Sequence, residues 1–152
     1  IFSLTGWKVG FVMAAPPLLS VLAKAHQFLT FTTPPNLQAA VAYGLAKDDA
    51  YFAAMRAGLE RSRDRFVEGL AAAGLATLPS RGTYFVNLDL AANGISEDDV
   101  AFCRRLVTTL GVAAIPVSAF YAEEPVTSVV RFCFAKADAT LDAAIERLAR
   151  LG

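Results

Sequence analysis

The sequence predicts an α/β fold, in which segments with a helical pattern alternate with segments that have a strand pattern. Apolar residues recur every three or four positions in five stretches, at residues 16–29, 36–45, 48–73, 96–110 and 138–151. Short apolar or β-branched and aromatic runs lie between them, at residues 11–15, 83–90, 112–117 and 128–135. Strands interleaved with helices indicate a layered α/β architecture.

Composition narrows the class of protein. The chain has 152 residues, of which 55% are hydrophobic and 18% charged, so it can bury a sizeable core. Fourteen basic residues balance fourteen acidic ones, and no apolar run approaches the roughly 18 residues of a membrane span. We therefore expect small-molecule chemistry or protein contact, with no nucleic acid and no membrane as partner.

The two cysteines, Cys103 and Cys133, lie far apart in the sequence and each sits in an apolar pattern. Neither has the CxxC or Cys/His spacing of a metal site. We expect reduced thiols in the core, no bound metal, and a cytoplasmic protein.

The first 45 residues contain one predicted strand and two predicted helices. Gly6 and Lys8 precede the apolar run 11–15, so the Lys8 cation would lie near the start of the predicted strand. The flexible glycine would let the backbone approach a ligand at this point. A phosphate could sit there, and a solvated edge charge is the alternative. Two prolines begin the helix that ends at Leu29. A loop containing Phe31 and two further prolines follows, and Asn36 is a suitable N-cap for the next helix.

The remaining residues predict a long helix and then an α/β segment. Asp48 and Asp49 open the helix, which stops at Gly74 and is long enough to link two domains. Its charged run at residues 61–65 has mixed signs and is expected to be solvated. Residues 96–99 resemble a capping box, and Asp138 or Thr140 is expected to cap the last helix.

Arg131 is the most informative charged residue of the second half. It interrupts an alternating apolar strand, where a buried guanidinium must find an anion. That anion is either a protein carboxylate or a bound ligand. Tyr84 and Phe85, in the strand at 83–90, are expected to belong to the core.

Five blocks occur in the order found in aminotransferases that depend on pyridoxal phosphate. They are Thr5–Gly10, Phe31–Pro34 with Gln38–Ala40, Gly82–Phe85, Gly111–Pro116 with Ser118–Tyr121, and Arg131–Phe134. The chain thus resembles the fold-type I class, and most of all its kynurenine, glutamine and methionine aminotransferase branch. The resemblance implies that residues 1–58 end the large cofactor-binding domain, including the start of the interdomain helix. Residues 59–152 would form the small C-terminal α/β domain.

The same resemblance implies roles for three residues. Lys8 would bind the cofactor phosphate, Arg131 the α-carboxylate of the substrate, and Phe31 would line the substrate site of the neighbouring subunit in a homodimer. The lysine that carries the cofactor as a Schiff base would lie eight residues before Lys8, immediately before Ile1, so no catalytic residue is expected within this segment.

The activity implied is ping-pong transamination between an amino acid and a 2-oxo acid. The amino acid would be apolar, aromatic, or similar to methionine or glutamine. Three alternatives stay open: a carbon-sulfur β-lyase with the same cofactor, a non-catalytic regulator built on the aminotransferase fold, and a small interaction domain without cofactor.

Overall fold

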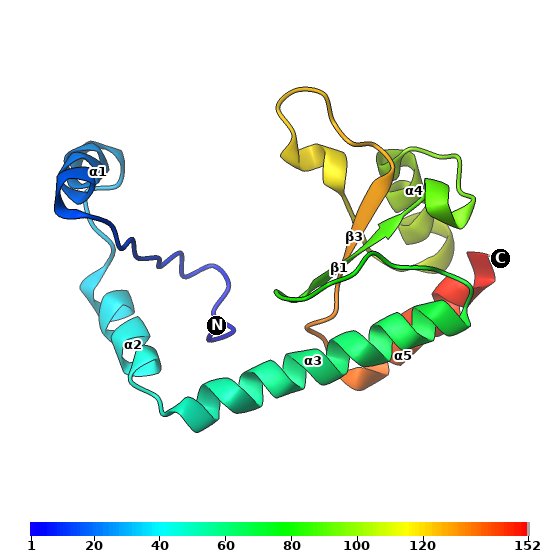
Figure 1. The fold of residues 1–152 in the computed structure, drawn as a ribbon, viewed down its shortest axis with the longest axis horizontal. Coiled ribbons are helices and arrows are strands. Elements are labelled where there is room, and N and C mark those ends of the chain that lie inside the picture. Colours follow the sequence, from blue (N-terminus) through cyan, green and yellow to red (C-terminus); the bar gives the residue numbers. More distant parts are fainter. Residues whose placement is uncertain (152) are drawn as a thin grey trace. The chain divides into compact units, whose positions relative to one another are not determined.

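The computed structural model describes residues 1–151 and divides into two compact units, Ile1–Phe52 and the residues from Ala53 on (Figure 1). The division falls within the long helix α3 (Asp49–Ala72). The boundary predicted at residue 58 lies in the same helix, and the assignment of the two sides to a large and a small domain stays a prediction.

The first unit consists of two helices joined by irregular segments. Helix α1 (Pro16–Leu29) begins on its two prolines, as predicted, and ends at Thr30, whose backbone N–H donates to the carbonyl of His26. Helix α2 (Pro35–Leu45) also begins on a proline. Within residues 1–52 only Gly44 is buried, against the ring of Phe2, so the unit has no hydrophobic core.

Two predictions for the first unit are wrong. Residues 11–15 form no strand, because strand backbone must pair with a neighbour and none of the described strands pairs with this segment. Asn36 is not the N-cap of α2: that position is Pro34, which offers no side-chain cap, and Asn36 lies inside the first turn. The fixed φ of the consecutive prolines starts the helix earlier than the capping pattern suggested.

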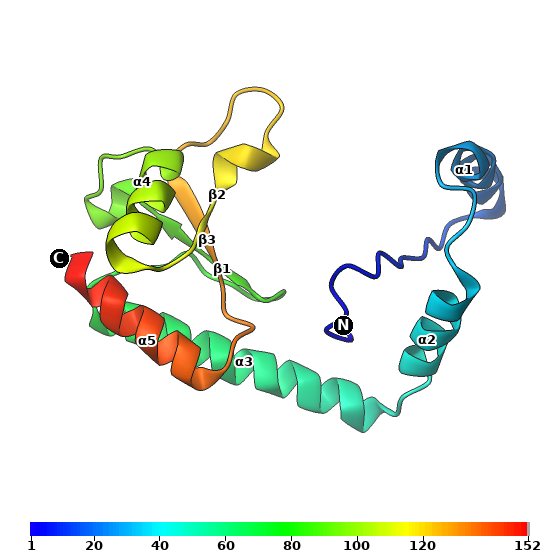
Figure 2. The same cartoon turned by 180° about the vertical axis from the view of Figure 1, so that it is seen from behind.

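The second unit is built on an antiparallel sheet in the order β1–β3–β2 (Figure 2). Its strands are β1 (Phe85–Asp89), β2 (Ile115–Pro116) and β3 (Val129–Cys133). Burial alternates along β1 and β3, so one face of the sheet packs into the core and the other does not. The strand predicted at residues 112–117 is thus only two residues long.

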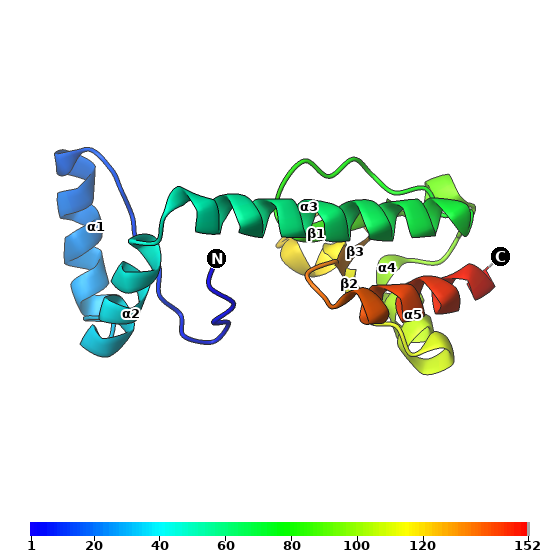
Figure 3. The same cartoon turned by 90° about the horizontal axis from the view of Figure 1, so that it is seen from below.

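Helices cover the buried face of the sheet. Helix α3 lies beside α5 (Asp138–Leu148), with Gly69 against the side chain of Ile145 (Figure 3). Helix α4 (Asp99–Arg105) continues into the π-helical turn η2 (Leu106–Leu110). Short 3-10 turns complete the unit: η1 (Ala91–Asn93), η3 (Val117–Phe120) and η4 (Ala149–Leu151). The most deeply buried large side chains come from both layers: Leu70, Leu88, Phe102, Leu106, Val130, Phe134 and Leu141.

Helix starts in this unit follow the predictions in part. Asp98 caps α4, where its carboxylate accepts from the backbone N–H of Ala101 at 2.7 Å. The N-cap of α5, in contrast, is Ala137 with no side-chain cap, so neither predicted residue fills that position. The charged run of α3 does more than face water, since Arg65 donates to both carboxylate oxygens of Asp142 on α5 at 2.7 Å.

Candidate functional site

Arg131 lies at the centre of the face of the sheet that is turned away from the core. The antiparallel register places it on β3 directly opposite Asn87 on β1. Its guanidinium carbon lies 4.0 Å from the ring centroid of Phe85 and 4.4 Å from that of Phe120. Two aromatic rings therefore hold the cation by cation–π contacts, which limits where its side chain can swing.

No carboxylate pairs with Arg131 among the described residues. Its Nε atom is buried without a hydrogen-bond partner, and so is the Oδ1 atom of Asn87 opposite. Buried polar atoms are nearly always paired, so two unpaired ones on facing residues are unusual. Within residues 1–151 no carboxylate neutralises Arg131, and the bound-ligand alternative stays a prediction.

A hollow of about 440 Å³ opens beside Arg131. It is lined by the loop before β1 and by the exposed face of the sheet: Pro79, Ser80, Arg81, Gly82, Thr83, Phe85, Asn87 and Arg131. None of these residues is acidic and two are arginines, so the hollow suits an anion. Thr83 adopts a left-handed φ of 61°, a costly conformation for a β-branched residue and one typical of functional sites.

Phe85 and Tyr84 differ from the prediction. Phe85 is not a core residue but covers the Arg131 guanidinium, and Tyr84 is 46% exposed. The core side of β1 is formed by Val86 and Leu88 instead. Strand alternation could have revealed this, because residues 85 and 87 share one face and 86 and 88 the other.

Sequence reasoning missed Asn87, and it quoted Phe120 within a block without a role. Phe120 is brought to Arg131 by the turn η3, which a buried carboxylate anchors. Asp99, at the start of α4, is 0% exposed and accepts from the backbone N–H of Ser118 at 2.7 Å and from its hydroxyl at 3.0 Å. A buried carboxylate satisfied in this way fixes the turn that carries the ring.

Lys8 and Phe31, the other two predicted site residues, both lie in the first unit. Lys8 is exposed and forms no ion pair among the described residues, and its φ is 53°. Phe31 is 75% exposed with a φ of 65°, at a helix end where glycine is the usual residue. Both predicted site residues of this unit thus hold a conformation that disfavours large side chains.

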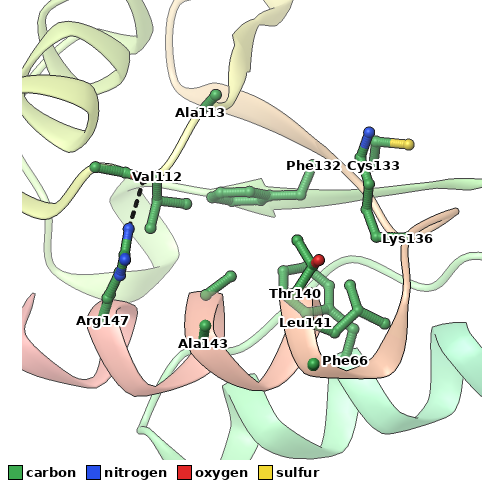
Figure 4. Close-up of a pocket in the computed structure, with 13 residues that line it drawn as sticks. Phe66, Val112, Ala113, Phe132, Cys133, Lys136, Thr140, Leu141, Ala143 and Arg147 are labelled. Atoms are coloured by element: carbon green, nitrogen blue, oxygen red, sulfur yellow. Dashed lines mark hydrogen bonds between the residues drawn. The ribbon is translucent and has the colours of Figure 1, made fainter.

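A second hollow, of about 480 Å³, lies in the second unit between α5, β3 and the segment 111–113 (Figure 4). It shares no lining residue with the hollow at Arg131. Its walls are mostly apolar side chains of the core, such as Phe66, Phe132 and Leu141. Arg147 closes one end by donating to the Gly111 carbonyl at 3.1 Å. No convergent set of polar groups points into this space.

Both cysteines are free thiols, as predicted, but only Cys103 lies in the core, and Cys133 is half-buried. Burial, with a smaller contribution from the Asp99 carboxylate, raises the pKa of Cys103 to about 11, so it is an unreactive thiol near neutral pH. The described residues contain no group of three or more side chains suited to a metal ion. None of the described helices is long and apolar enough to cross a membrane.

The family model for aminotransferase class I and II matches residues 1–148. Methionine aminotransferase of Escherichia coli is 40% identical over 150 residues, covering 99% of this chain and 39% of that protein. Human kynurenine–oxoglutarate transaminase 1 is 32% identical over 167 residues, covering 97% of this chain and 40% of that protein.

Solved structures agree. N-succinyldiaminopimelate aminotransferase from Mycobacterium tuberculosis superimposes with a TM-score of 0.87 at 42% identity, covering 97% of this chain and 38% of that one. The chain belongs to the class I and II aminotransferase family, whose members use pyridoxal phosphate. It spans about two fifths of the length of the relatives it matches.

Proposed function

We propose that the protein containing this chain is a pyridoxal phosphate-dependent aminotransferase that moves an amino group between an amino acid and a 2-oxo acid. One observation carries the proposal: the Arg131 guanidinium is held between two rings, has no protein carboxylate as partner, and borders a hollow without acidic residues. Family membership supports the same reaction.

Arg131 supplies what the α-carboxylate common to both substrates requires. A guanidinium offers parallel N–H donors that match the two oxygens of a carboxylate, which a lysine ammonium cannot do. The rings of Phe85 and Phe120 exclude water from the cation and so strengthen its attraction for the anion. This side chain binds and orients the substrate, and it takes no part in proton transfer.

Lys8 fits the cofactor phosphate. It carries a compact charge that no described carboxylate neutralises, and Gly6, with a φ of 102°, lies two residues before it. When bound, pyridoxal phosphate supplies an electron sink for the carbanion left when the α-proton departs. Lys8 would hold the phosphate end and fix the position of the ring. Lys8→Ala in the full-length enzyme should therefore weaken cofactor affinity, measured by fluorescence titration.

Phe31 supports a homodimer in which two chains complete each site. Phe31 is 75% exposed on a strained backbone, which suits a side chain that contacts a ligand or partner rather than water. Phe31→Ala should reduce kcat/KM for apolar donors by about tenfold and leave alanine as donor nearly unchanged. Mixing Phe31→Ala with Arg131→Ala subunits should restore activity once exchange is shown. Exchange without recovery would argue against shared sites.

The donor is proposed to be apolar, aromatic, or similar to methionine or glutamine. A methionine aminotransferase and a kynurenine–oxoglutarate transaminase among the relatives support amino acids of this kind, and an N-succinyldiaminopimelate aminotransferase at similar identity makes that compound a necessary member of any donor panel. A panel of donors with one 2-oxo acid acceptor tests the range. Pyruvate and ammonia released from a cysteine conjugate, without amino transfer, would show a β-lyase instead.

Arg131→Ala in the full-length enzyme is the decisive variant. It removes two charge-assisted hydrogen bonds, so kcat/KM for amino acids should fall by about two orders of magnitude or more while the cofactor absorbance is retained. Arg131→Lys should recover only a small part, because a lysine cannot bind in two-pronged fashion. Near-normal kcat/KM for Arg131→Ala would place the carboxylate elsewhere.

We also propose that the enzyme works in the cytoplasm. Two free cysteines in a structured unit suit a reducing compartment. Fractionation of cells that express the full-length protein tests this placement.

A further inference from the structure

The pair formed by Asn87 and Arg131 is chemically complementary. Residues directly opposite each other in an antiparallel ladder have Cβ atoms about 4.5–5.5 Å apart, with side chains on the same face. The unpaired atom of Asn87 is an acceptor, Oδ1, and the unpaired atom of Arg131 is a donor, Nε–H. Both residues border the same hollow.

We propose that Asn87 is a positioning residue for Arg131, whose Oδ1 accepts from Nε–H when a carboxylate occupies the two Nη groups. The inference rests on the function proposed above and adds to it a residue that sets how tightly the substrate carboxylate is held. Arg131 would then be bound on three sides, by two rings and one amide oxygen.

The surroundings leave Asn87 as the natural partner of Nε. The rings of Phe85 and Phe120 contact the guanidinium but offer no acceptor of comparable strength. The other polar residues of the hollow, Ser80, Arg81 and Thr83, lie in the loop before β1, and the Ser80 hydroxyl already donates to the Phe85 carbonyl at 2.8 Å. Arg131 lies opposite Asn87 on β1 and Ile115 on β2, and of these two residues only Asn87 carries a side-chain acceptor.

The arrangement also explains why an amide rather than a carboxylate suits this position. A neutral acceptor orients Nε–H and leaves the positive charge available to the substrate. An aspartate at residue 87 would instead provide an internal anion directly opposite the guanidinium, and it would compete with every substrate carboxylate.

Three variants of the full-length enzyme test the proposal. Asn87→Leu removes the acceptor and keeps the same branched skeleton of side-chain heavy atoms, and Asn87→Asp turns it into an anion. Asp89→Asn is the control: residue 89 lies on the same strand and face, one step along the ladder, opposite Val129. The readouts are KM, kcat, and the Kd of 3-phenylpropionate, a monocarboxylate without an amino group, together with the melting temperature.

Asn87→Leu should raise the Kd of 3-phenylpropionate and the KM for donors by about tenfold with little change in kcat, because one hydrogen bond to a charged group is lost. Asn87→Asp should raise both by more than Asn87→Leu does. Asp89→Asn should change neither. The Nε–H proton of Arg131 should also shift downfield on inhibitor binding in the wild type, and this shift should be absent in Asn87→Leu.

The outcomes separate this inference from the function on which it rests. If Arg131→Ala abolishes carboxylate binding while both Asn87 variants bind 3-phenylpropionate as the wild type does, the positioning role is wrong and the proposed function stands. If Asn87→Leu lowers the melting temperature but leaves the Kd of 3-phenylpropionate unchanged, the positioning role is also wrong. A wild type that binds 3-phenylpropionate without transaminating overturns the proposed function, while the Kd values still report on Asn87.

Discussion

Every buried apolar side chain described in residues 1–151 lies between Phe66 and Leu148, in the second unit, and none lies in the first. The first unit leaves large apolar side chains exposed instead, among them Phe11, Met13, Phe28 and Leu29. Helices form in both units, since prolines and local periodicity suffice to place them. Among the described residues the second unit has a core of its own, whereas the first unit presents apolar side chains for further contacts, as expected of a segment that spans about two fifths of its relatives' length.

The largest expected effect contrasts Phe102 with Phe28. Phe102 is 0% exposed, so Phe102→Ala leaves a cavity and should reduce the free energy of unfolding by about 3–5 kcal/mol. Phe28 is 86% exposed, and Phe28→Ala should change it by less than about 0.5 kcal/mol. Urea denaturation of residues 1–152 measures both. Equal losses would mean that the first unit buries a core in solution.

Two helix glycines sharpen the contrast. A Cβ on Gly69 would meet the Ile145 side chain on α5, which packs against the core, so Gly69→Ala should destabilise the second unit by about 1–3 kcal/mol. A Cβ on Gly44 would lie 2.7 Å from the ring of Phe2, which sits on an irregular segment and can move. Gly44→Ala should therefore cost less, because the gain in helix propensity, up to about 1 kcal/mol, offsets the shift. Thermal unfolding of both variants decides the order.

The smallest effect concerns an ion pair at the surface of the second unit. The Arg65 guanidinium lowers the pKa of Asp142, so the folded carboxylate binds its proton less readily than the unfolded one. The stabilisation is present above the unfolded pKa of about 3.9 and is lost as the pH falls through the lower folded value.

Asp142→Asn should thus be less stable than the wild type at pH 6, and the difference should shrink as the pH falls below about 3.9, measured by urea denaturation across pH. Tyr43→Phe in the first unit, which removes a hydrogen bond from Lys47, is the matched control. It should leave the pH dependence of stability at acid pH unchanged. A difference between Asp142→Asn and the wild type that stays constant with pH would show that the pair is not electrostatic.

Local signals in the sequence predicted the helices well, and signals that depend on a partner strand did not. Helix α1 has the predicted bounds because Pro16 and the apolar spacing act within a few residues. Residues 11–15 have strand composition, but none of the strands within residues 1–151 pairs with them, and the chain spans about two fifths of its relatives' length. Strand β2 stops at Pro116, since proline has no N–H to extend the ladder.

The residues of the candidate site show the same distinction between local signals and signals that depend on distant parts of the chain. Arg131 could be found from one strand, because a guanidinium in an apolar run requires an anion. Asn87 could not, because its place opposite Arg131 depends on the register between strands more than 40 residues apart. Phe120 reaches the site only through the turn η3, which a tertiary contact fixes.

That tertiary contact has a consequence for how activity can be lost. Asp99 holds Ser118, and two residues later Phe120 covers the guanidinium. A random mutagenesis screen for inactive enzyme should therefore return Asp99 and Ser118 substitutions alongside those at Arg131, although neither residue borders the hollow. A carboxylate at the start of α4 thus controls the ring that covers Arg131, although that carboxylate does not border the hollow.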